Sequence, residues 1–184
     1  AGLDGETADL LRRASNLTAL ADQPPETAAG LDRRVAADKA RLDSALRSQG
    51  YYAAAVSISV DIAAKPIALR VSAVPGSRYK FGATRLEWAP TPVESDVAAL
   101  AAKAAKLPEG EPALATKVLA AQEELLAALR AAGYPFAAVD RQAVVDHDRK
   151  IMETRFVARP GPAARFGPTT LAGDSGVADG LILG

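Results

Sequence analysis

The sequence of 184 residues contains the same long segment twice, and this repeat limits the folds that the chain can adopt. LDRRVAADKARLDSALRSQGYYAAAV, residues 31–56, aligns with LATKVLAAQEELLAALRAAGYPFAAV, residues 114–139, at an offset of 83. Two shorter segments, VPGSRYKFG at 74–82 and RPGPAARFG at 159–167, align at an offset of 85. A repeat of fixed period indicates units of the same construction. We therefore predict two like units, with the two additional residues of the second copy in a hairpin loop, where length costs little.

Each aligned segment begins with a predicted helix. Its apolar residues recur at steps of four, seven and four, which is typical of one face of an amphipathic helix of about five turns. Gly50 and Gly133 follow at the position of a C-cap glycine in the left-handed conformation. Tyr51 and Tyr134 come next, where we expect a side chain that packs back on the last turn.

The period changes from 3.6 to 2 after each glycine, which predicts a β-hairpin with one buried face. The expected buried positions of the first hairpin are Val56, Ile58, Val60, Ile62, Ile67, Leu69 and Val71. Those of the second are Val139, Ala143, Val145, Met152, Thr154, Phe156 and Ala158. Arg141 shares this register, and the pattern gives no reason for a charge there.

Residues 79–88 are predicted as a strand and 91–107 as a helix. Thr91, with Pro92 next and Glu94 three residues later, predicts a capping box and a helix start at Thr91. The second copy therefore runs strand, helix, helix, strand, strand. The first copy has a predicted helix at 7–20 with no strand before it, and a third copy begins at 164–173.

The predicted fold class is α+β, in tandem units at 1–75, 76–160 and 161–184. Lys and Arg together number 22, as do Asp and Glu, so no net charge favours nucleic acid. The chain has no cysteine and one histidine, which excludes thiolate chemistry and a His-rich metal centre. We predict no catalytic residue, cofactor or metal, and no apolar run approaches the roughly 18 residues of a membrane-spanning helix.

The β-α-α-β-β order, the GYY and GYP segments that begin at Gly50 and Gly133, and the repeated PGxxxxFG junctions resemble polypeptide-transport-associated (POTRA) domains. Residues 11–52 are similar to the first POTRA domain of the TamA family of translocation and assembly module subunits. The resemblance covers about residues 7–173. It implies two helices packed on a three-stranded mixed sheet. The sequence departs from the family in lacking the first domain's opening strand, most of a third domain and the outer-membrane barrel.

The resemblance also implies a function. TamA-like proteins carry three POTRA domains as a periplasmic arm ahead of an outer-membrane β-barrel, and they act in the insertion or secretion of other outer-membrane proteins. The implied partners are unfolded outer-membrane proteins or autotransporter clients and a TamB-like protein, and no nucleic acid. The POTRA arm of a two-partner secretion transporter, or another cell-envelope scaffold, is the alternative.

In POTRA folds the second strand lies at a sheet edge, where its backbone groups can pair with an extended guest chain. The resemblance therefore gives ten candidate binding residues. They are Val56, Ser57, Ile58, Ser59 and Val60 in the first copy, and Val139, Asp140, Arg141, Gln142 and Ala143 in the second. Charges blunt the second edge, so we expect the first to accept a guest more readily. A solvated edge that binds nothing is the competing interpretation.

Overall fold

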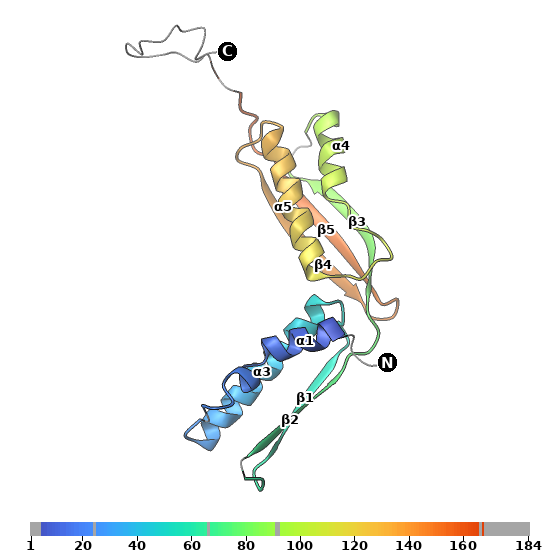
Figure 1. The fold of residues 1–184 in the computed structure, drawn as a ribbon. Helices are drawn as coiled ribbons and strands as arrows, with labels where there is room; N and C mark the ends of the chain where they lie inside the picture. Colours follow the sequence, from blue (N-terminus) through green and yellow to red (C-terminus); the bar gives the residue numbers. More distant parts are fainter. Residues whose placement is uncertain (1–4, 24, 66, 91–92, 166, 168–184) are drawn as a thin grey trace, which may run out of the picture.

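The computed structural model describes residues 5–23, 25–65, 67–90, 93–165 and 167. The first unit, residues 5–74, consists of α1 (Gly5–Ala14), α2 (Asn16–Ala19), α3 (Ala28–Ser48), β1 (Ala55–Asp61) and β2 (Ala68–Val74). The second unit, residues 80–159, consists of β3 (Lys80–Trp88), α4 (Ser95–Ala104), α5 (Ala115–Ala131), β4 (Ala138–Asp146) and β5 (Ile151–Arg159). The units lie end to end and are joined by residues 75–79 (Figure 1).

The second unit has the predicted three-stranded mixed sheet. Its strand order is β3-β5-β4, with β3 parallel and β4 antiparallel to β5. The inward face of β5 is buried as predicted, at Met152, Thr154, Phe156 and Ala158. These residues share one core with Phe81 of β3, Val97 of α4 and Leu125 of α5, among others. The alternation of β5 thus matches the helical face that covers it.

The first unit is built on two antiparallel strands, β1 and β2, in the part of the chain that the structure describes. Its core is smaller and contains Leu42, Leu46, Tyr51 and Val56. The predicted buried face was right at Val56 and wrong toward the turn, because four apolar residues there are exposed. They are Ile62 (77%), Ile67 (53%), Leu69 (38%) and Val71 (44%). In the second unit, β3 pairs with β5 and contributes Phe81 to the core, whereas β2 has no such neighbouring strand among the described residues.

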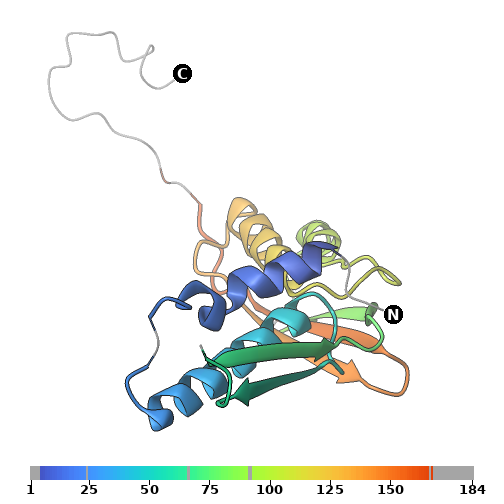
Figure 2. The ribbon, with the colours of Figure 1, turned by 60° about the horizontal axis from the view of Figure 1, so that its bottom comes forward.

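The predicted helix at 7–20 is interrupted at Ser15, which is the N-cap of α2 and accepts a hydrogen bond from the Thr18 amide. The Ser15 hydroxyl donates to the buried carboxylate of Asp38 on α3 at 2.8 Å, and the Asn16 amide donates to the same group at 2.6 Å. A buried carboxylate is tolerated because these donors satisfy it. The interruption therefore fixes α1 and α2 on α3, and both views show α3 alongside the β1–β2 hairpin (Figure 2).

The predicted helix start at Thr91 was wrong. Helix α4 begins at Ser95, and Glu94 is its N-cap without a side-chain capping hydrogen bond; Thr91 and Pro92 lie outside the described residues. Pairing with β5 continues beyond Trp88, since the Ala89 amide donates to the Ala158 carbonyl at 2.9 Å. Val93 and Glu94 are not helical, and Asp96 supplies the negative charge in the first turn of α4.

The prediction that the two additional residues of the second copy lie in its hairpin loop was wrong. Strands β4 and β5 have nine residues each, compared with seven in β1 and β2. The connection is shorter in the second copy, at residues 147–150, than in the first, at 62–67. The extra length therefore extends the paired ladder, which adds cross-strand contacts.

Candidate polypeptide-binding edges

Strands β1 and β4, which carry the ten predicted binding residues, both lie at sheet edges. Binding at these residues stays a prediction. The structure does not gather them into one site, because β1 belongs to the first unit and β4 to the second. Each edge is therefore described by itself, from the direction of its backbone groups and the side chains that cover them.

The backbone groups that face away from the neighbouring strand can be assigned from the ladders. In an antiparallel pair, residues point both backbone groups alternately toward the partner strand and away from it. The Ala158 carbonyl bonds to Ala89 on the β3 side, so its β4 partner, Val139, faces outward. Every second residue of β4 from Val139 onward also faces outward, which gives Val139, Arg141 and Ala143. The β1–β2 ladder has the equivalent register, which gives Val56, Ile58 and Val60.

Helix α5 covers the beginning of the β4 edge. The Gln122 side-chain amide donates to the Val139 carbonyl at 2.6 Å and accepts a hydrogen bond from Arg141. This contact explains the charge at position 141, because the guanidinium turns toward α5 instead of entering the core. Asp140 forms an exposed ion pair with Arg159 of β5. The charges predicted to blunt this edge are thus held by specific partners.

The β1 edge lacks the equivalent cover. Lys39 occupies the position of Gln122 at the repeat offset of 83, and it forms an ion pair with Asp43 on its own helix at 2.8 Å. Among the described residues, no side chain hydrogen-bonds to the backbone of Val56, Ile58 or Val60. Ser57 and Ser59, on the outer face of the strand, are exposed and uncharged. This edge therefore presents free donors and acceptors without charged neighbours on the strand before Asp61.

The repeated junction segments bind the repeated helix caps. The Tyr79 amide donates to the Gly50 carbonyl at 2.8 Å, and the Ala164 amide donates to the Gly133 carbonyl at the same distance. Both glycines have positive φ, 89° and 92°, as predicted for the C-cap position. We call these two contacts the cap–junction bonds. They give the repeated PGxxxxFG segment a structural role, which is to attach the chain to the helix end of the preceding unit.

Three aromatic rings extend the contact between the two units. The Tyr52 hydroxyl donates to the Ala113 carbonyl of the second unit at 3.1 Å. The Tyr79 ring lies edge-on to Tyr52, at 5.5 Å between centroids, and its hydroxyl is 2.8 Å from Nδ1 of His147. The ten binding residues predicted from the sequence do not include Tyr52. The repeat does carry a signal for it, since Pro135 stands at the equivalent position of the second copy.

The Tyr52 contact predicts a pH dependence. Burial raises the pKa of the Tyr52 hydroxyl above its usual 10.0, so the folded state favours the neutral form. Its contribution to stability is then complete below that value and is lost as the pH rises through the folded-state pKa. We expect Tyr52→Phe to be less stable than the parent near neutral pH by about 1 kcal/mol. The difference should narrow above pH ~10. Urea denaturation at several pH values measures it, and a constant difference would contradict the contact.

Two further properties concern the residues that the structure describes. No three side chains of His, Cys, Asp or Glu among them are placed to hold a metal ion. None of their helices combines the length and the apolar character that crossing a membrane requires.

No protein-family model matches the sequence, and no curated protein does so either. Solved structures do resemble the fold. POTRA domains 3–5 of BamA from Haemophilus influenzae match with a TM-score of 0.50 and 17% identity, over 95% of this chain and 70% of that one. POTRA domains 1–2 of the periplasmic domain of Omp85 from Anabaena match with a TM-score of 0.48 and 14% identity, over 85% of this chain and 87% of that one. With its helix pairs, mixed sheet and repeated junctions, the chain has the α+β fold of tandem POTRA domains.

Proposed function

We propose that this chain is a periplasmic interaction arm of an outer-membrane protein assembly or translocation factor. It binds extended segments of client or partner polypeptides by strand addition at the β1 edge. The observation that carries the proposal is the row of uncovered backbone groups at Val56, Ile58 and Val60, beside the exposed, uncharged Ser57 and Ser59. Backbone pairing supplies affinity without demanding a particular guest sequence, which suits a receptor for many clients.

The finer assignment rests on the sequence resemblance. The Leu-rich first helix, the Pro24–Pro25 turn and the Arg-rich second helix favour a TamA-like arm, with a TamB-like protein as a partner and a C-terminal barrel of its own in the same protein. We propose that the two units correspond to POTRA domains at 1–75 and 76–160. The third domain, proposed to begin at 161, lies almost entirely outside the described residues.

The substitution Ile58→Pro tests the β1 edge. Proline removes the outward Ile58 amide, and the ladder to β2 does not use that donor, so the unit should stay folded. Loss of one intermolecular hydrogen bond is expected to weaken binding of an extended client peptide about three- to tenfold. Fluorescence titration with a labelled peptide from an outer-membrane β-strand measures the affinity.

The matched control is Ile58→Val, which keeps the amide and nearly the same side chain. It should bind like the parent. Circular dichroism establishes that both variants are folded. Equal affinities for Ile58→Pro and Ile58→Val would show that the guest does not pair with this edge.

A further inference from the structure

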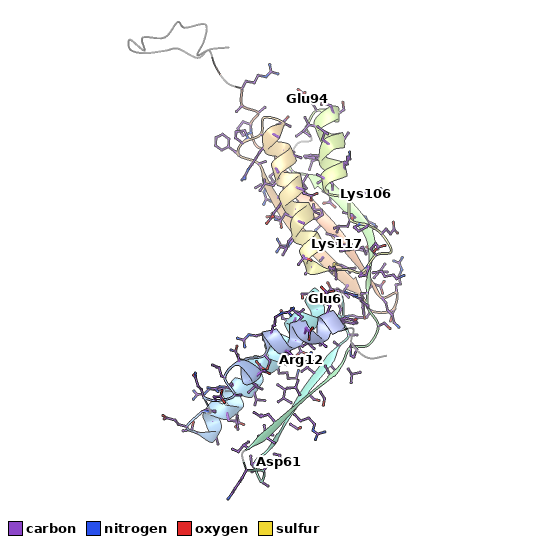
Figure 3. The ribbon with its side chains drawn as sticks, in the orientation of Figure 1. Glu6, Arg12, Asp61, Glu94, Lys106 and Lys117 are labelled. Carbon is purple, nitrogen blue, oxygen red and sulfur yellow. The ribbon has the colours of Figure 1, made fainter. Side chains whose placement is uncertain are left out.

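An apolar groove lies beside the β4 edge, at the end of the second unit that faces the first. Its volume is about 340 Å³. Its lining is mostly apolar and includes Tyr52, Leu119, Ala143, Val145 and Met152, with Arg141 as the charged member. Figure 3 shows the neighbouring Lys117 on the turn of α5 nearest the first unit, whereas Asp61 lies at the far end of the first unit.

The groove is placed to receive a side chain of a strand that pairs with β4. The Val139 carbonyl is already bound by Gln122, so the outward backbone groups that remain for a guest begin at Arg141 and include those of Ala143. Directly opposed residues in a sheet point to the same face. A guest residue opposite Ala143 would therefore point toward the helices, into the groove, and the small Ala143 side chain leaves space for it.

The first unit supplies one wall of this groove. Tyr52 follows the α3 cap and is held against the second unit by its hydrogen bond to Ala113 and by the Tyr79 ring. At the repeat offset of 83, Ala36 and Val60 take the places of Leu119 and Ala143 in the first unit, so the composition of this groove is specific to the second.

We propose that the β4 edge binds an extended polypeptide that carries a large apolar side chain, preferably aromatic, opposite Ala143, and that Tyr52 and Leu119 form the seat for that side chain. This inference rests on the strand-addition function proposed above and adds a sequence preference to it. The first edge accepts extended chain by its backbone, and the second edge, at the junction between units, selects for an anchoring residue. The occupant is a client segment in extended conformation, since a helix cannot pair with the edge.

The test uses the whole chain with Ile58→Pro, which weakens binding at the β1 edge, so that the β4 edge contributes more of the measured affinity. The probes are two labelled, lysine-flanked peptides of alternating threonine and valine, one with phenylalanine and one with alanine at the centre. The phenylalanine peptide should bind about tenfold more tightly. Adding Tyr52→Ala, or separately Leu119→Ser, should reduce this ratio to about one while the alanine peptide binds as before. Leu100→Ser, an exposed leucine on α4, is the matched control and should leave the ratio unchanged.

The proposed seat would be overturned if the preference for the phenylalanine peptide persisted in both Tyr52→Ala and Leu119→Ser. It would also be overturned if the two peptides bound equally before either substitution was added. If circular dichroism shows that Tyr52→Ala loosens the junction, the peptide preference of Leu119→Ser alone tests the seat. Loss of all binding with Ile58→Pro would refute the second edge and leave the proposed function at the first edge intact. Failure of the parent chain to bind either peptide would refute both proposals.

Discussion

Phe156→Ala is expected to lower the free energy of unfolding of the second unit by about 3–5 kcal/mol. The Phe156 side chain is fully buried at the centre of β5, and β3 and β4 flank it. Truncation removes apolar contact and leaves a cavity that the surrounding sheet and helices cannot close. Trp88, the only tryptophan of the chain, lies in this unit, so its fluorescence during urea denaturation reports the second unit selectively.

Val144→Ala is the matched control for this prediction, because Val144 is on the same sheet and is 63% exposed. The free energy of unfolding of Val144→Ala should differ from that of the parent by no more than about 0.5 kcal/mol. A Trp88 transition that is the same in Phe156→Ala as in the parent would contradict the assignment of Phe156 to the centre of the core.

Gly50→Val is expected to destabilise the protein by about 2–3 kcal/mol. A positive φ of 89° costs an L-residue about 1–2 kcal/mol, and a β-branched side chain at least as much. A Cβ at this position would also lie 3.4 Å from the carbonyl oxygens of Tyr79 and Ala113. Both belong to the contact between units, so the first cap–junction bond should weaken by about a further 1 kcal/mol. Thermal and urea denaturation measure the loss.

Gly110→Val separates strain from crowding. Gly110 has a similar φ of 83°, but a Cβ there meets nothing within 4 Å. The substitution Gly110→Val should therefore lower the stability only by the cost of the backbone strain. Solution scattering should show a broader distribution of shapes for Gly50→Val than for Gly110→Val. Identical losses and identical scattering would indicate that the cap–junction bond does not hold the units together.

The repeat made the cap glycines, the helix faces and the second sheet predictable. Gly50 and Gly133 could be identified because each marks a change from period 3.6 to period 2, which is a local signal. The start of α4 was mispredicted. The capping motif indicated a helix start at Thr91, whereas α4 begins at Ser95, and Glu94 is its N-cap without a side-chain capping hydrogen bond.

The candidate edges were predictable from the resemblance, and Asp140 and Arg141 indicated that the two edges differ. The contacts that cover the second edge were not predictable. Gln122 covers the second edge through a contact across 17 residues, and Tyr52 reaches the second unit across 61. No periodic pattern in the sequence indicates either contact. The departures from the repeat, Lys39 for Gln122 and Pro135 for Tyr52, become informative when the two units are superposed.

Amide hydrogen exchange, measured by NMR with and without a saturating client peptide, tests the central claim most directly. Strand addition at the β1 edge predicts slower exchange at the outward amides of Val56, Ile58 and Val60. The amides of Ser57 and Ser59 face β2 and should exchange at the same rate in both samples. Unchanged exchange at Ile58 and Val60 with peptide bound would contradict the account.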